Sequence, residues 1–315
     1  MNVVVGVSPL TLEEMIALGR PETQLTISDS AWTRIANARD IADEELARGS
    51  IVYGLTVGLG SNVTMPIERS SVPDYERKVI SARIVGVGDP LSEESCRRAL
   101  GLRIVNLGLG YSAVSPNVVE QLVAMYNANI TPVVSSLGSI GSSDLGQCAQ
   151  LCATAIGVGE VWVRGVRMSA SEGLTSIGRQ PVDLGAKDAL GLFNSGAVTQ
   201  ARAIEYVEAL RNVLDAATIS AVAACEGYGV NPSPFTEDVT STKAIPGGRE
   251  ASRRIMELLA GSWIIEDGAI ARAQHPISFR ALVPLIAAIT DCVGGFTSLI
   301  VGEVNESTDS PVVLH

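Results

Sequence analysis

The feature that most constrains the fold is a long helix predicted to follow Asn194, Ser195 and Gly196. Apolar side chains recur there every three or four residues, as they do along one face of an α-helix. The series ends near Gly227 and Gly229, and glycine commonly terminates helices. A helix of this length with one apolar stripe is typical of a helical bundle. The stripe consists of Ile204, Val207, Leu210, Leu214, Ala217 and Ala221.

Helix signals recur through the rest of the chain. Thr11 and Glu14 have the spacing of a capping box, in which each side chain binds a free N–H group of the other residue. A second helix is predicted from about Ser28 to Gly49, and Ser92 is predicted to cap a third through its own hydroxyl. Strand-like alternation is confined to short pieces such as 159–167, a possible hairpin. The sequence therefore predicts a mainly α protein.

The most apolar segment is 281–301. It is interrupted by Pro284, Asp291 and a glycine pair, and therefore lacks the roughly 18 uninterrupted apolar residues of a membrane span. We expect a buried core helix there and no membrane association. The first fifteen residues carry no basic region of the kind that begins a signal peptide.

Charge and composition exclude several classes of function. The 34 acidic and 23 basic residues give a net charge of −11, which disfavours nucleic-acid binding. The 5 cysteines form no CxxC pair, so a disulfide framework or thiolate zinc site is not indicated, and reduced thiols in the cytoplasm are expected. With only 2 histidines, a histidine-rich metal site is excluded, and we expect no metal.

Two short glycine patterns resemble nucleotide-binding loops when taken alone. Both 58–60 and 108–110 read Gly-Leu-Gly, but neither follows a convincing strand of a βαβ unit. Helix termination is the better interpretation, and no nucleotide cofactor is expected.

Five segments carry most of the functional information. They are 52–60 (VYGLTVGLG), 138–145 (GSIGSSDL), 187–194 (KDALGLFN), 274–280 (QHPISFR) and 303–311 (EVNESTDSP). In this order they are similar to the YGVNTGFG, GSVGASGDL, KEGLALxNG, QDxYSxR and ExNSxTDNP motifs of the histidine and phenylalanine ammonia-lyase family. The chain thus resembles this superfamily of ammonia-lyases and aminomutases across nearly all of its length.

The resemblance implies an elongated helical bundle with a smaller N-terminal region that carries the active-site loops. Residues 1–185 correspond to that region, residues 186–315 to the start of the central bundle, and the family's C-terminal region is absent. Family members are tetramers whose active sites draw on three subunits. A homo- or hetero-oligomer is therefore expected, in which a separate polypeptide can supply the C-terminal part.

The resemblance also implies a prosthetic group made from the chain itself. In the family, an Ala-Ser-Gly triad cyclises and loses water to form 4-methylideneimidazol-5-one (MIO), an electrophile that ordinary side chains do not provide. This sequence is one residue shorter between Pro132 and Leu145, so two pairings of Gly141–Asp144 with the triad are open. One places Ser142-Ser143-Asp144 on the triad, and the other places Gly141-Ser142-Ser143 there. Both keep a central serine, and neither ends in glycine.

Further roles follow from the matched positions. Tyr53 matches the catalytic base, Asn194 the asparagine near the prosthetic group, and Gln274 the glutamine of the pocket. Arg280 matches the arginine that holds the substrate carboxylate in a charge-assisted pair. Arg83 falls at the position that selects the substrate side chain, where an arginine favours an acidic or strongly polar group.

Three other positions depart from the family motifs. Ile277 stands in place of a tyrosine, and Thr56 and Leu59 stand in place of asparagine and phenylalanine.

These features support two hypotheses. The first is a carbon–nitrogen lyase or aminomutase acting on an α-amino acid through MIO, either as a complete enzyme or as one subunit of a split enzyme. The second is a divergent homologue without MIO that serves as a partner or scaffold subunit or catalyses a different reaction in the same pocket. A nucleotide-dependent α/β enzyme built on the glycine loops is a third hypothesis, which the absence of a convincing βαβ unit disfavours.

Overall fold

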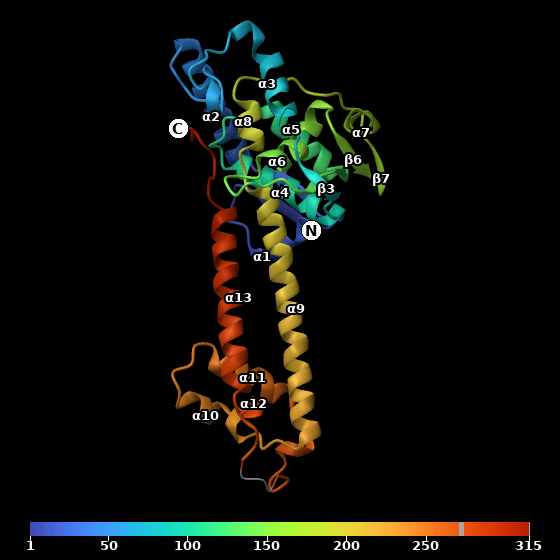
Figure 1. Cartoon of the computed structure of the whole chain (residues 1–315), viewed down its shortest axis with the longest axis vertical. Coiled ribbons are helices and arrows are strands. Elements are labelled where there is room, and N and C mark those ends of the chain that lie inside the picture. Colours follow the sequence, from blue (N-terminus) through green and yellow to red (C-terminus); the bar gives the residue numbers. More distant parts are fainter. Residues whose placement is uncertain (271–273, 315) are drawn as a thin grey trace. The chain divides into compact units, whose positions relative to one another are not determined.

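The computed structural model describes residues 1–270 and 274–314 and confirms a mainly α chain (Figure 1). The chain divides into two compact units, Met1–Glu205 with Ile300–His315 and Tyr206–Leu299. The expected boundary between residues 185 and 186 falls within the first of these units. The α-helices are α1 Leu12–Ala17, α2 Asp29–Arg48, α3 Val72–Ser81, α4 Glu93–Gly108, α5 Pro116–Asn127, α6 Leu145–Cys152, α7 Ala170–Ser176, α8 Asp188–Phe193, α9 Ala197–Tyr228, α10 Glu237–Ser241, α11 Gly248–Leu258, α12 Ile277–Arg280 and α13 Leu282–Val304.

Local hydrogen bonds set the helix ends as the sequence predicts. Thr11 and Glu14 form a complete capping box at the start of α1. Ser28 accepts from the backbone N–H of Ala31 at the start of α2, and Gly49 ends this helix in the left-handed conformation. Ser92 caps α4 through its hydroxyl without a reciprocal glutamate. The expected long helix is α9, which ends at Tyr228.

The strands form three small sheets in the first unit. β1 pairs in parallel with β2, β3 pairs antiparallel with β5, and β6 lies between β4 and β7. The predicted hairpin at 159–167 is confirmed as β6 and β7, which are joined at Arg164 and Gly165, both with positive φ. The strands are β1 Asn2–Val5, β2 Gln24–Ile27, β3 Val87–Pro90, β4 Ile130–Pro132, β5 Ser135–Leu137, β6 Glu160–Val163 and β7 Val166–Ser169.

Helix α4 lies at the centre of the first unit, and every residue from Ser95 to Gly108 is buried. Gly101 permits this packing, since an added Cβ atom would lie 3.1 Å from side-chain atoms of both Leu18 and Tyr126. The glycine at 108 ends α4, as predicted. The expectation of helix termination is wrong for 58–60, because these residues belong to a loop after α2 in which Gly60 begins a short 3-10 turn.

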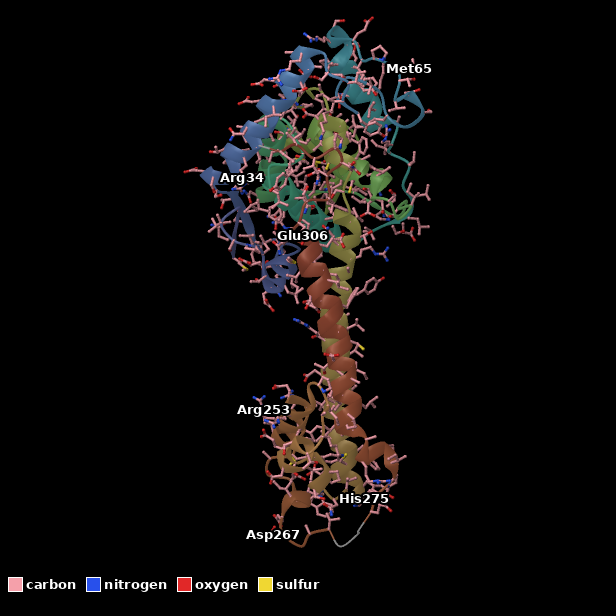
Figure 2. All side chains as sticks on the ribbon, turned by 90° about the vertical axis from the view of Figure 1, so that its left-hand side faces the viewer. Arg34, Met65, Arg253, Asp267, His275 and Glu306 are labelled. Atoms are coloured by element: carbon pink, nitrogen blue, oxygen red, sulfur yellow. The ribbon has the colours of Figure 1, made fainter. Side chains whose placement is uncertain are left out.

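The second unit has its own apolar core. It is formed by the last turns of α9, by α11, by the first turns of α13 and by the segments between them. Figure 2 labels Arg253, Asp267 and His275 among the side chains of this unit. The buried core residues are Val222, Cys225, Val230, Phe235, Ala251, Ile255, Leu259, Ile264, Leu282, Val283, Ile286 and Ala287.

The expectation of a buried core helix at 281–301 is wrong for helix α13. The helix runs through Pro284, Asp291 and the glycine pair, but only 22% of its most apolar window is buried, so it is not a buried core helix within this chain. The second unit's core includes only residues of its first turns, and Leu285, Ile289, Phe296 and Leu299 are exposed. By length and composition alone, α13 also satisfies the test for a membrane-crossing helix, as core helices of soluble proteins do.

Candidate active site

Tyr53 lies in a tight loop that follows α2. The Thr56 hydroxyl donates to the carbonyl of Ser50 at 2.5 Å and accepts from the N–H of Val52 at 2.8 Å, so it closes the loop on both sides. The Gly60 N–H donates to the phenolic oxygen of Tyr53 at 3.1 Å. The Tyr53 hydroxyl is therefore held by the main chain while 39% of the residue stays exposed to solvent. Thr56, which departs from the family motif, stabilises this loop.

Gly54 sets the direction of the chain immediately after Tyr53. It adopts a φ of +72°, and an added Cβ would lie 2.3 Å from a methyl carbon of Leu190 on α8. The loop can therefore approach α8 closely only because residue 54 is glycine.

We expect Gly54→Ala to lower the free energy of unfolding by about 2–4 kcal/mol, because left-handed strain and the collision with Leu190 add together. Urea denaturation measures this loss. Gly49→Ala is the matched control, since Gly49 also has a positive φ but no atom within 4 Å of the added carbon. Equal losses in the two variants would contradict the predicted collision.

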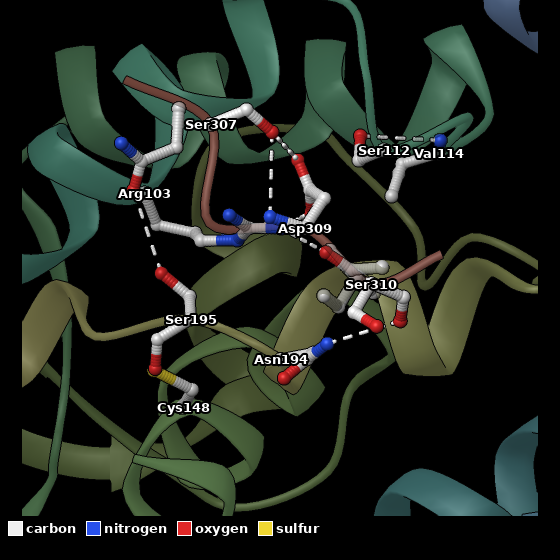
Figure 3. Close-up of polar contacts among 12 residues, drawn as sticks. Arg103, Ser112, Val114, Cys148, Asn194, Ser195, Ser307, Asp309 and Ser310 are labelled. Carbon is white, nitrogen blue, oxygen red and sulfur yellow. Dashed lines mark hydrogen bonds and ion pairs between the residues drawn. The ribbon is translucent and has the colours of Figure 1, made fainter. Parts of the chain in front are cut away.

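The candidate triad lies in the segment before α6. Gly141 has a φ of +83°, Ser142 is exposed, and Ser143 has a φ of +67°, which is uncommon for a residue other than glycine. The Ser143 hydroxyl donates to Oδ1 of Asn194 at 2.7 Å. The Asn194 amide in turn donates to the carbonyl of Ser310 at 3.1 Å (Figure 3). Asn194 thus joins the triad segment to the segment after α13.

Asp144, the next residue after Ser143, is buried. Its N–H donates to the carbonyl of Ser195 at 2.8 Å. Its carboxylate accepts from the N–H and the hydroxyl of Thr199, each at 2.7 Å. The backbone nitrogen and both carboxylate oxygens of Asp144 therefore bind the start of α9, and Asp144 fixes the end of the triad segment.

Arg83 lies beside the residue that precedes Asn194. Its guanidinium carbon is 4.7 Å from the ring centroid of Phe193, a cation–π contact, and its Nη1 donates to the carbonyl of Val79 at 2.9 Å. Tyr75 precedes Arg83 by two helical turns. Burial, and then the charge of Glu76, raise the pKa of Tyr75, while Arg83 and the backbone lower it. Tyr53 also acts on the Tyr75 hydroxyl electrostatically, so these groups are neighbours.

A buried carboxylate that the motifs did not indicate holds the start of α8. Glu76 accepts from the backbone N–H of Lys187 at 3.1 Å and from that of Ala189 at 2.8 Å. Burial raises the pKa of Glu76 to about 7. Because α8 contacts the Tyr53 loop through Leu190 and ends at Asn194, Glu76 supports two candidate site residues at once.

The residues beside Glu76 are also buried and charged. The Lys187 ammonium donates to the carbonyl of Ser112 at 2.6 Å, and burial lowers its pKa to about 8. The Asp188 carboxylate accepts from the N–H of Ser115 at 2.8 Å and from that of Gly185 at 2.6 Å, and burial raises its pKa to about 6. Arg39 lies 3.6 Å from Asp188. Arg103 and Asp309 are also buried and charged, and they lie beside each other (Figure 3).

We expect Glu76→Gln to remove a pH dependence from the stability of the protein. The pKa of Glu76 in the folded chain, about 7, exceeds its ordinary value of 4.5, so the folded state binds this proton more tightly than the unfolded state. This contribution is fully present below pH 4.5 and is lost as the pH rises through 7. Urea denaturation between pH 4.5 and 8 should show the free energy of unfolding of the wild type falling relative to that of Glu76→Gln.

Glu45→Gln is a control, because Glu45 should change the free energy of unfolding with pH in the opposite direction. A hydrogen bond from Ser50, followed by one from Arg48, lowers the pKa of Glu45, so its contribution is lost as the pH falls. A difference between wild type and Glu76→Gln that stays constant with pH would contradict the role of Glu76.

Gln274 and Arg280 belong to the second unit. Gln274 is exposed, and Arg280 donates through Nε to the carbonyl of His275 at 2.9 Å. The buried ring of His275 accepts from the N–H of Asn231 at 2.8 Å through Nε2. Ile277, the residue in place of the family's tyrosine, is 67% exposed. The structure thus joins Ser143 and Asn194 within the first unit, whereas Gln274 and Arg280 belong to the second unit.

No cluster of three histidine, cysteine, aspartate or glutamate side chains suited to a metal ion occurs in residues 1–270 and 274–314.

The comparisons with known proteins define the class. Residues 10–315 match the family model of aromatic amino acid lyases, and the chain therefore belongs to this family. Among curated relatives, it is 31% identical over 313 residues to histidine ammonia-lyase of Alkaliphilus metalliredigens and 28% identical over 306 residues to that of Burkholderia multivorans. These matches cover 99% and 96% of the chain but 62% and 60% of the relatives. The chain thus spans about three fifths of their length.

Solved structures share the fold. Ergothionase from Treponema denticola, an ergothioneine-degrading enzyme, superposes with a TM-score of 0.95 at 24% identity, covering 100% of this chain and 63% of that one. Histidine ammonia-lyase from Trypanosoma cruzi superposes with a TM-score of 0.89 at 24% identity, covering 100% of this chain and 59% of that one. The resemblance found in the five motifs and the expected helical fold are confirmed.

Proposed function

We propose that this chain forms part of a carbon–nitrogen lyase or aminomutase that acts on an α-amino acid. The observation that carries the proposal is the contact between Ser143 and Asn194 in a chain of the aromatic amino acid lyase family. This contact joins the triad segment to the matched asparagine, which lies 51 residues further along the chain. The histidine ammonia-lyases among the relatives support an amino-acid substrate.

The residues present fit an MIO group with Gly141-Ser142-Ser143 as the triad. In this pairing the backbone nitrogen of Ser143 closes the ring on the carbonyl carbon of Gly141, and Ser142 loses its hydroxyl. The left-handed backbone of Ser143 supports it, since that conformation is the one glycine adopts readily. The other pairing would use the nitrogen of Asp144, whose N–H already donates to Ser195 and whose side chain is fixed by Thr199.

When formed, this group supplies an electrophile that activates the substrate for loss of ammonia. The chain's own residues would transfer the proton and bind the substrate. Tyr53, with its oxygen fixed by Gly60, would take the proton from the substrate's β-carbon. Asn194 would hold the triad segment, and Arg83 would face a polar or acidic substrate side chain. Arg280 would bind the substrate carboxylate, with Gln274 as a further polar group of the pocket.

Oligomer formation is part of the same proposal. Several apolar side chains on α13 are exposed in the single chain and would be covered by other subunits, whether copies of this chain or a separate C-terminal polypeptide. We place the assembly in the cytoplasm, since the cysteines of the described residues are free. The exposed side chains include Leu285 (56%), Ile289 (42%), Phe296 (41%) and Leu299 (74%).

A panel of α-amino acids tests the proposal. The purified protein is incubated with histidine, aromatic and acidic amino acids, and release of ammonia is measured together with formation of the α,β-unsaturated acid. A β-amino acid product would identify a mutase. If no substrate reacts, either with the chain alone or after co-expression with a C-terminal subunit, the protein is the divergent homologue without lyase activity.

A further inference from the structure

One cavity in the first unit has no part in the candidate active site. It has a volume of about 450 Å³ and is formed by the segment after α1, the start of α4, β4 and the turn between β6 and β7. None of the residues matched to the family's site lines it. The residues that matter here are Arg20, Glu93, Glu94, Arg97, Thr131 and Arg164.

Arg97 gives this cavity a buried positive charge. It is 3% exposed, and its Nε, Nη1 and Nη2 donate to the carbonyls of Arg20, Tyr126 and Thr23 at 3.0, 2.7 and 2.8 Å. The guanidinium also stacks 3.9 Å from the ring centroid of Tyr126. Of its five N–H groups, two remain after these three bonds. No carboxylate in the described part of the chain forms an ion pair with Arg97, and burial lowers its pKa.

Two more arginines line the cavity. Arg20 and Arg164 are exposed, and neither side chain forms an ion pair or hydrogen bond within residues 1–270 and 274–314. Glu94 is committed to Arg98, at 2.6 Å. The carboxylate of Glu93 is thus opposed by three guanidinium groups in a protein whose net charge is −11.

We propose that this cavity binds a small organic or inorganic anion that carries carboxylate or phosphate groups. Arg20 and Arg164 contact the anion from the rim, and Arg97 contributes charge from the wall, where a guanidinium held by main-chain carbonyls needs no reorganisation. Glu93 weakens the binding by repulsion. The site does not depend on the proposed lyase activity, because it shares no residue with it.

Isothermal titration calorimetry with inorganic phosphate and with succinate tests the proposal on the whole chain at low ionic strength. We expect one binding event per chain for at least one of these probes, and the comparison of the two shows which oxyanion the site prefers. Arg20→Ala/Arg164→Ala should weaken binding by at least about tenfold, since each lost charged hydrogen bond is worth that much. Glu93→Gln should strengthen it.

Arg48→Ala/Arg179→Ala is the matched control, because it removes the same charge from an exposed and a partly exposed arginine that pair with glutamates outside the cavity. It should leave binding unchanged, and urea midpoints show that all variants fold. The proposal is overturned if neither probe binds, or if the two double variants lose the same affinity. A third outcome would also overturn the proposal: the free amino acid glycine binds to the wild type, and Glu93→Gln weakens that binding. The site would then recognise an ammonium group.

Discussion

Tyr53→Phe should lower the rate of ammonia release by about a hundredfold or more while the protein stays folded. The phenolic oxygen is the group that would take the β-proton, and a positioned base typically accelerates such a step by factors of this size. The phenylalanine ring preserves the packing of the loop and removes only the oxygen to which Gly60 donates. The measurement is the initial rate of formation of the unsaturated acid with the best substrate of the amino-acid panel.

Tyr206→Phe is the control for this experiment, since Tyr206 is an exposed tyrosine of α9, 55% accessible, outside the matched motifs. Its rate should equal that of the wild type. A Tyr53→Phe variant that keeps full activity would remove Tyr53 from the mechanism without affecting the family assignment. A wild type that is inactive both alone and with a C-terminal subunit would refute the lyase itself.

The peptide that contains residues 138–145 should be lighter than its sequence by two water molecules. One water comes from the Gly141 carbonyl when the Ser143 nitrogen closes the ring, and the other from the Ser142 side chain. Ser142→Ala should therefore show no loss of the second water and should abolish activity, because the exocyclic methylidene carbon of the group derives from that side chain. Accurate peptide mass after proteolysis, without any substrate, is the measurement.

Ser143→Ala separates the two triad pairings. With Gly141-Ser142-Ser143 as the triad, this variant keeps the mass deficit and loses only the hydrogen bond to Asn194. If Ser143→Ala instead removes the loss of the second water and Ser142→Ala does not, the triad is Ser142-Ser143-Asp144. A wild-type peptide of unmodified mass, alone and with any C-terminal subunit, would mean that no MIO forms and would favour the divergent homologue.

The features that the sequence predicts best are local ones. Thr11, Ser28, Ser92 and Gly49 determine helix ends through contacts within a few residues, so pattern and chemistry agree there. The hairpin at β6 and β7 follows from alternation and a turn that its own residues form. The family motifs indicate Tyr53, Asn194 and Ser143, and the structure places the last two in contact.

Contacts between residues far apart in the sequence could not be predicted from the sequence pattern. Glu76 binds the backbone of Lys187 across 111 residues, and nothing near Glu76 in the sequence distinguishes it from a solvated helix residue. The burial of α13 depends on what covers it, which the apolar composition of that segment does not specify. The cavity arginines are distant along the chain too, since Arg20 follows α1, Arg97 is in α4 and Arg164 is in the turn between β6 and β7.

The two-sided contact of Asn194 has a consequence for biosynthesis. The amide holds Ser143 on one side and the carbonyl of Ser310 on the other, across 116 residues. While the ribosome is still making the chain, Ser143 and Asn194 can meet as soon as both have emerged, but the second contact must wait for Ser310. The candidate triad is therefore anchored on both sides only after α13 and Ser310 have been synthesised, 116 residues after Asn194.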